Sequence, residues 1–292
     1  MKNILITGSS GFIGNYTAKY LLEKKYNVFC ISSKNTGIVK KSNFLKKTYN
    51  KEKLKEFIFK NKINYVLMSH GSIDHNSEFD KIFKDHFTFT KLVTESLNHK
   101  TFKKLIFLSS GDEYGFPEKL PIKESYLCKP ISNYALVKNI STNYLLNYFN
   151  DTQFSVIILR LFLIHGKNQK NDRLIPMIKN TIKKNKVFYA NSINQKKDFA
   201  HISELSKCLL NILTYKDKVQ DIFNFGSGYA ISIKNVIKEI ENIVGKKLNL
   251  EINTNKKIKN SFSFYPNINK IKKKFKIDNA TKFKIALKND DQ

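Results

Sequence analysis

The sequence predicts an α/β fold built on a doubly wound parallel sheet, with a smaller mixed α/β domain at the C-terminal end. Over the first 165 residues, short apolar runs rich in β-branched residues alternate with segments of helical periodicity, which is typical of parallel βαβ units. A glycine-rich turn joins the first apolar run to the first helical segment. The alternation changes after about residue 166. We therefore expect two domains, 1–165 and 166–292, with approximate boundaries and some interleaving of elements.

Each element follows from its own periodicity and end signals. The predicted strands are 2–7, 27–32, 65–69, 104–110, 155–161 and a strand running into a turn at 223–228. The predicted helices are a first one after the glycine-rich turn, 51–60, 79–97, a long helix after Pro130, 174–184, 202–213 and 231–244, with Gly245 at the end of the last. The last forty residues are rich in lysine and less periodic.

Composition indicates an ordinary globular chain with 292 residues, 41% of them hydrophobic. No segment approaches the roughly 18 apolar residues that cross a bilayer, and the N-terminus runs directly into the glycine-rich loop without a signal peptide. We expect a cytoplasmic protein without a membrane partner. Cys30, Cys128 and Cys208 are odd in number and widely spaced, which favours reduced, at least partly buried thiols and no metal site.

The formal net charge of +28 raises the possibility of a nucleic-acid partner. All but two of the 52 basic residues are lysines, however, and they are spread from Lys2 to Lys288. Base recognition and bidentate phosphate binding favour arginine, and only Arg160 and Arg173 are present. We therefore expect no specific nucleic-acid function. The positive potential is suited to attracting a small phosphate-bearing substrate.

The glycine-rich turn contains Gly8, Gly11 and Gly14 between the first strand and the first helix. Glycine permits a tight turn there, lets the backbone approach a pyrophosphate and allows the helix to pack closely on the sheet. The helix N-terminus then offers free N–H groups to the phosphates. This arrangement predicts a Rossmann-type dinucleotide site over Gly8–Gly14.

The end of the second strand indicates which dinucleotide is bound. NAD-binding sites carry an acidic residue there that binds the ribose hydroxyls. Here the strand ends in Ser32, followed by Ser33 and Lys34. A serine does not repel a 2′-phosphate and Lys34 has the charge to pair with one, so NADP is favoured and NAD is left possible. Lys34 as one more surface lysine is the alternative.

A candidate catalytic set consists of Ser110, Tyr134 and Lys138. Tyr134 and Lys138 are four residues apart on a predicted helix and therefore share one face. A nearby ammonium lowers the pKa of a tyrosine, which fits it for proton exchange with a carbonyl or alcohol. Ser109 and Ser110 end a predicted parallel strand, where sites in such folds lie, and a hydroxyl there can stabilise developing charge.

These motifs together resemble the extended short-chain dehydrogenase/reductase family, the NAD(P)-dependent epimerases, dehydratases and reductases of nucleotide-linked sugars. The likeness covers nearly the whole chain. The matching segments are Thr7–Gly14, Met68–Gly71, Ser109–Gly115, Tyr134 with Lys138, Arg160–Gly166, Asp198–Ile202 and Phe223–Gly228. The resemblance implies a homodimer that binds a nucleotide-linked sugar.

The resemblance also assigns roles to individual positions. Tyr134 is the general acid/base, Lys138 binds the nicotinamide ribose and tunes Tyr134, and Ser110 holds the substrate oxygen. The remaining cofactor positions are Gly8, Ser10, Gly11, Phe12, Ile13, Gly14, Ser32, Ser33, Lys34, Ser69, His70, Gly71 and Leu161. The substrate positions are Ser110, Asp112, Leu163 and Lys197, with Lys197 at the place of an arginine that meets the substrate diphosphate. Asp198 and His201 are expected to be structural.

Departures from the family pattern indicate which of the family's reactions the chain is expected to catalyse. Gly111 and Asp112 follow Ser110 where the 4,6-dehydratases carry Asp-Glu, which disfavours that reaction. Leu163 and His86 each replace a family asparagine. We expect NADP-dependent reduction of a 4-keto nucleotide sugar, with an NAD-dependent 4-epimerase as the alternative. A catalytically idle binding or scaffold member is disfavoured because the catalytic set is complete.

Overall fold

The computed structural model describes residues 2–71, 77–252, 262–278 and 281–290. Its contacts group the chain into two compact units. The first consists of Met1–Gly115, Leu127–Leu161 and Ser206–Phe223, and the second of Phe116–Tyr126, Phe162–Leu205 and Asn224–Gln292. Each unit is thus assembled from several stretches of chain. The assignment of a cofactor role to 1–165 and a substrate role to 166–292 stays a prediction.

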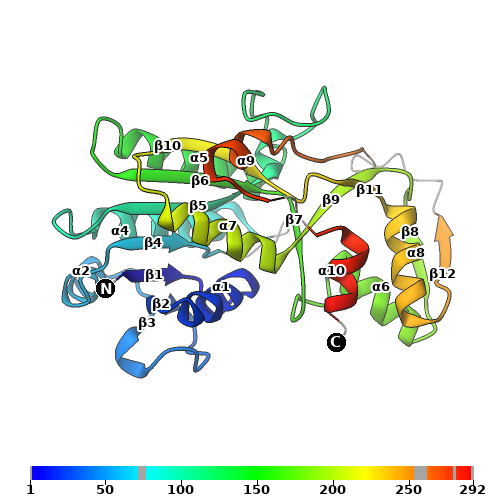
Figure 1. The fold of residues 1–292 in the computed structure, drawn as a ribbon, viewed down its shortest axis with the longest axis horizontal. Coiled ribbons are helices and arrows are strands. Elements are labelled where there is room, and N and C mark those ends of the chain that lie inside the picture. The colour runs from blue at the N-terminus through cyan, green and yellow to red at the C-terminus, as the bar shows by residue number, and fades with distance from the viewer. Residues whose placement is uncertain (1, 72–76, 253–261, 279–280, 291–292) are drawn as a thin grey trace. The chain divides into compact units, whose positions relative to one another are not determined.

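The central sheet has seven strands in the order β10-β6-β5-β4-β1-β2-β3 (Figure 1). These strands are β1 (Asn3–Thr7), β2 (Asn27–Ser32), β3 (Phe44–Lys46), β4 (Tyr65–Met68), β5 (Lys104–Ser110), β6 (Ser155–Leu161) and β10 (Gln220–Phe225). The pairings from β3 through β6 are all parallel. β5 is buried along its whole length, as expected for a strand covered on both faces.

Helices cover both faces of this sheet, which confirms the doubly wound fold (Figure 1). One face packs against α2 (Lys51–Lys60), α4 (Phe89–Glu95) and α5 (Asn133–Tyr148), which contribute Leu54, Phe89 and Leu145 to a shared apolar core. α1 (Phe12–Glu23) and α7 (Ile202–Thr214) lie beside each other, with the Thr17 and Ser206 hydroxyls 3.3 Å apart.

The strand order reverses between β1 and β4. The chain passes from β1 outward through β2 and β3, and then returns to form β4, β5 and β6 on the other side. In open α/β sheets ligands bind at such a switch point, beyond the carboxyl ends of the strands. The segments that follow these two strands are Gly8–Gly14 and Ser69–Gly71, so the topology brings two predicted cofactor segments to one place.

The predicted helix over 79–97 is interrupted. It forms as α3 (Phe79–Phe83), a π-helical turn (Lys84–Thr88) and α4, and it ends at Glu95. A π turn accommodates one extra residue without ending the helix, so side chains beyond it are rotated relative to an unbroken helix. His86 lies within this turn and is buried.

The predicted helix over 231–244 begins two residues late. Ala230–Ser232 forms strand β11, and the Ser232 hydroxyl accepts a hydrogen bond from the Asn235 N–H at 3.2 Å, which starts α8 (Ile233–Val244). Gly245 ends the helix in the left-handed conformation, as predicted. Ser132 caps α5 in the same way through the Ala135 N–H.

The second unit contains short strands that the sequence pattern did not predict. β7 (Leu163–His165), β9 (Lys196–His201) and β11 form one sheet, and β8 (Val187–Ala190) pairs with β12 (Asn249–Ile252). α6 (Leu174–Lys183), α8 and α10 (Phe283–Asn289) share an apolar cluster with Phe188, Phe199 and Leu248. α9 (Asn269–Phe275) completes the unit's helices among the described residues.

Two further expectations can be compared with the described part of the chain. The three cysteines are free, with Cys30 and Cys208 buried and Cys128 half-buried, as expected. Within the described residues, no helix has the length and apolar character needed to cross a membrane.

Candidate active site

The glycine loop, Gly8–Gly14, connects β1 to α1 and has no room for side chains at its first and last glycines. Gly8 has a φ of +75°, and a Cβ atom there would lie 2.7 Å from the His70 Cα and the Ser69 carbonyl oxygen. A Cβ at Gly14 would overlap the Gly8 carbonyl. Gly11 precedes α1 and supplies no side-chain cap for the first helical N–H groups. The loop therefore has the shape and donors that a dinucleotide pyrophosphate requires.

The last residue of β2, Ser32, and the two residues after it carry no carboxylate. Ser32 is buried, and its hydroxyl donates to the Lys34 carbonyl at 2.7 Å and accepts from Ser9 at 3.2 Å. The Ser33 hydroxyl lies 3.5 Å from that of Ser10 across the loop, and Ser33 and Lys34 are exposed. The Ser32 hydroxyl is therefore engaged internally, whereas the side chain of Lys34 is exposed.

His70 links β1 to the π-helical turn. Its Nε2 lies 3.0 Å from the Thr90 hydroxyl and 3.3 Å from the His86 carbonyl oxygen, and its Nδ1 lies 2.6 Å from the Thr7 hydroxyl. Burial, followed by the Lys138 charge, holds the pKa of His70 well below its usual value, so the ring is neutral. The His70 imidazole is thus an internal cross-link, while its backbone lies beside Gly8.

The candidate catalytic residues lie at the carboxyl end of β5 and on the adjoining α5. Ser110 ends β5, and its hydroxyl accepts from the Asp112 N–H at 3.2 Å. Tyr134 and Lys138 are buried on one face of α5, with the Lys138 Nζ 6.0 Å from the centre of the Tyr134 ring. The structure therefore confirms the shared helix face on which the prediction of a Tyr–Lys pair was based.

The ammonium of Lys138 contacts strand β5 and is shielded from solvent. Its Nζ donates to the Leu108 carbonyl oxygen at 2.8 Å and lies 4.7 Å from the centre of the Phe107 ring. Burial lowers the pKa of Lys138 to about 8, against the opposing effect of the Glu113 carboxylate. The ammonium is therefore fixed in place but close to its titration point at physiological pH.

An aromatic contact supports Tyr134 on its other side. The His86 ring lies edge-on to the Tyr134 ring, with 5.5 Å between centroids. Gly71 has a φ of +102°, and a Cβ atom there would overlap the His86 ring. Gly71 thus leaves room for His86, which accounts for glycine at this predicted cofactor position in terms of packing.

A buried ion pair beneath this site escaped the sequence analysis. The Glu113 carboxylate is fully buried, and its Oε2 lies 3.0 Å from both Nε and Nη2 of Arg160. Arg160 stands in a largely apolar stretch of sequence, whereas Glu113 stands in a polar segment after two serines, a glycine and an aspartate, so no local signal linked the two residues. The sequence register of the sheet, which places Ser109 opposite Arg160, explains how they meet.

The remaining predicted substrate positions come from both units. Leu163 is exposed at the start of β7, and Asp112 is half-buried in the 3-10 turn Gly111–Tyr114 of the first unit. The Lys197 Nζ lies 4.7 Å from the Phe262 ring centre and 5.5 Å from that of Phe264. Leu161, which was predicted as a cofactor position, is half-buried at the end of β6.

Asp198 has a structural role. Its carboxylate accepts from the Ser227 N–H at 2.6 Å and the Gly228 N–H at 2.7 Å, which fastens the turn after β10. His201 contacts Asp290 at 2.9 Å and the Ser203 hydroxyl at 2.6 Å. Both side chains therefore hold segments of the second unit together, in line with the expectation from sequence.

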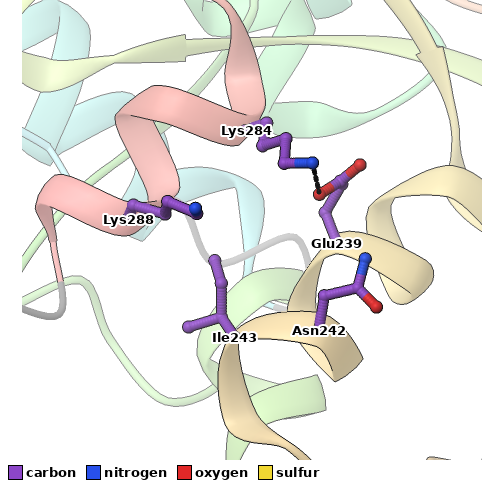
Figure 2. A pocket seen from close by; sticks show the side chains of 5 residues that line it. All are labelled: Glu239, Asn242, Ile243, Lys284 and Lys288. Carbon is purple, nitrogen blue, oxygen red and sulfur yellow. Dashed lines mark ion pairs between the residues drawn. The ribbon is translucent and has the colours of Figure 1, made fainter.

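A surface hollow of about 490 Å³ lies between α8 and α10 (Figure 2). It is lined by Glu239, Asn242, Ile243, Lys284 and Lys288, none of which is a predicted site residue. Lys284 and Glu239 approach to 3.9 Å across it. The charged residues in its lining are two lysines and one glutamate.

Comparisons with known proteins agree with this geometry. The sequence model of the NAD dependent epimerase/dehydratase family matches residues 4–226. A Methanocaldococcus jannaschii protein, provisionally named a UDP-glucose 4-epimerase, is 26% identical over 83% of this chain and 82% of its own. The Escherichia coli dTDP-4-dehydro-6-deoxyglucose reductase is 27% identical over 84% of this chain and 82% of its own.

Among solved structures, the fold is similar to UDP-glucuronic acid 4-epimerase from Bacillus cereus in complex with UDP-glucuronic acid and NAD. The two share 21% identity and a TM-score of 0.86 over 99% of this chain and 97% of the other. The chain belongs to the NAD-dependent epimerase/dehydratase family, which confirms the resemblance read from its motifs. It is accordingly an NAD(P)-dependent enzyme of the short-chain dehydrogenase type.

Proposed function

We propose that the enzyme reduces the 4-keto group of a nucleotide-linked sugar with NADPH. The observation that carries this proposal is the grouping of Ser110, Tyr134 and Lys138 at the carboxyl end of the parallel sheet that also bears the glycine loop. The absence of an acidic side chain after β2, together with the exposed Lys34, supports NADP over NAD. The Escherichia coli reductase among the relatives supports the reaction class.

Each residue contributes a separate part of the chemistry. The bound nicotinamide supplies the hydride. The Tyr134 hydroxyl donates a proton to the oxygen of the former ketone, and the Ser110 hydroxyl donates a hydrogen bond to that oxygen. Lys138 binds the ribose and favours loss of the Tyr134 proton through its charge. Lys197, which carries a charge above two phenylalanine rings, is proposed to meet the substrate diphosphate.

A 4-epimerase is the second candidate, because relatives and structural neighbours carry that name and the catalytic set would be the same. An epimerase regenerates its cofactor in each cycle, whereas a reductase consumes it. A 4,6-dehydratase is disfavoured because Gly111 stands where the 4,6-dehydratases carry an aspartate. Asp112 would then have to act alone in the elimination of water. The homodimer and the cytoplasmic location stay predictions.

A panel of nucleotide sugars tests the reaction class. Purified enzyme should oxidise NADPH in proportion to an added 4-keto nucleotide sugar, and it should leave NADPH unchanged with the matching 4-hydroxy sugars. Product analysis by mass spectrometry should show a gain of two hydrogens. Interconversion of 4-hydroxy epimers without consumption of NADPH would instead establish the epimerase.

The cofactor assignment predicts a change of preference on charge reversal at Lys34. Lys34→Glu should weaken NADPH binding by about 10–100-fold, because a hydrogen bond between charged groups contributes roughly 1.5–3 kcal/mol. NADH binding should change little, since NADH lacks the 2′-phosphate. Fluorescence titration measures both affinities. Lys53→Glu, at an exposed position on α2, is the control for net charge. Equal weakening of both cofactors by Lys34→Glu would contradict the assignment.

A further inference from the structure

The buried Glu113 carboxylate is bound from three segments of the chain. Its Oε1 accepts from the hydroxyls of Ser109 and, at 3.2 Å, of Thr142. Its Oε2 accepts from Asn139 at 3.1 Å and from Arg160 at 3.0 Å. Both oxygens are therefore saturated with donors, and the charge of the carboxylate is balanced by a buried guanidinium.

The donors stand next to proposed site residues in the sequence. Ser109 precedes Ser110 on β5, Asn139 follows Lys138 on α5, and Arg160 precedes Leu161 on β6. Glu113 itself lies in the 3-10 turn that Ser110 caps. One carboxylate thus connects the strand, the helix and the turn that carry the catalytic groups, although the proposed chemistry does not use it.

The charge of Glu113 also acts on Lys138. The other groups around the Lys138 ammonium are neutral or positive: the Leu108 carbonyl and Phe107 ring from β5, Tyr134 from α5, and His70 from the segment after β4. Arg160 faces Glu113 from β6, and His86 faces Tyr134 from the π-helical turn. Glu113 is the carboxylate that opposes the effect of burial on Lys138.

We propose that Glu113 is a positioning residue, which fixes the backbone segments bearing Ser110 and Lys138 and keeps the buried Lys138 ammonium charged. This inference rests on the role proposed for Lys138 in the reaction. The inference also gives Arg160 a role. Its guanidinium balances the Glu113 charge and thereby limits how strongly the carboxylate attracts the Lys138 ammonium.

The test measures Lys138 directly, without cofactor or substrate. Protein labelled with ¹³C at the lysine Cε is titrated by NMR, and the Lys138 signal is identified by its absence from Lys138→Arg. In the wild type it should titrate at a pH of about 8. Glu113→Gln should lower that midpoint, because it removes the carboxylate charge that opposes the effect of burial. Arg160→Gln should leave it unchanged or raise it.

The two variants separate charge from packing. Loss of packing alone would move both midpoints in the same direction, and that result, or an unchanged midpoint in Glu113→Gln, would overturn the proposal. If a single variant does not fold, the double variant Glu113→Gln/Arg160→Met removes both charges together and leaves no unpaired ion buried. It should lower the midpoint as well. Because no substrate enters this measurement, a wrong reaction class would not affect it.

Discussion

Tyr134→Phe should lower turnover by about 10²–10⁴-fold, because a positioned proton donor typically contributes that factor. The substitution removes the hydroxyl and keeps the ring that packs edge-on against His86 at 5.5 Å between centroids. Cofactor affinity should be nearly unchanged, since the hydroxyl is assigned to the substrate oxygen. Steady-state rates on an accepted substrate and fluorescence titration with NADPH provide the two measurements.

Tyr148→Phe is the matched control. Tyr148 lies on the same helix, is partly exposed and has no assigned role in the site, so its loss should not change turnover. Near-complete activity of Tyr134→Phe would contradict the whole catalytic assignment. Tyr134 would then be a core tyrosine whose spacing from Lys138 has no chemical meaning.

Gly8→Ala should be among the most damaging single substitutions in the first unit. Alanine at a φ of +75° costs about 1–2 kcal/mol from backbone geometry alone. The new Cβ would also lie 2.7 Å from backbone atoms of Ser69 and His70, which cannot rotate away. We expect a loss of more than about 4 kcal/mol in the free energy of unfolding, together with loss of NADPH binding.

Gly245→Ala isolates the backbone part of this effect. Gly245 has a φ of +74°, and a Cβ atom there would meet nothing within 4 Å. Its substitution should therefore cost only about 1–2 kcal/mol. Urea unfolding of both variants gives the comparison. Equal costs at the two positions would show that the close approach of the loop to the segment after β4 does not occur in solution.

The sequence was informative where local pattern and fold coincide. β1, β2, β4, β5 and β6 were predicted within a residue or so, because each is a short buried apolar run between turn signals. Helix periodicity alone could not reveal the π-helical turn, since the apolar residues on either side of it keep a helical spacing. That turn determines where the His86 side chain lies.

The strands of the second unit were missed for a different reason. β9 reads Lys196-Lys197-Asp198-Phe199-Ala200-His201, in which charged residues obscure the alternation. Its buried Asp198 is stabilised by backbone N–H groups of a distant turn, which no local pattern can show. β8 and β12 are four residues long, and they form through pairing over a long separation in the chain.

The candidate site likewise contains residues that local motifs predict and residues that only the fold brings together. Ser110, Tyr134 and Lys138 could be predicted because each stands in a local motif with a fixed spacing. Glu113 and Arg160 are 47 residues apart, and only the pairing of β5 with β6 brings them together. The ion pair that supports the site is therefore a property of the fold and was not predictable from either segment alone.

The most direct test of the proposed reaction follows the hydrogen that arrives at the sugar. NADPH carrying deuterium at the transferable position of its nicotinamide is mixed with enzyme and an accepted 4-keto nucleotide sugar. Reduction predicts that deuterium appears at C4 of the product and that product and oxidised cofactor form in equal amounts. A product whose C4 carries no deuterium, formed without net loss of NADPH, would contradict the account.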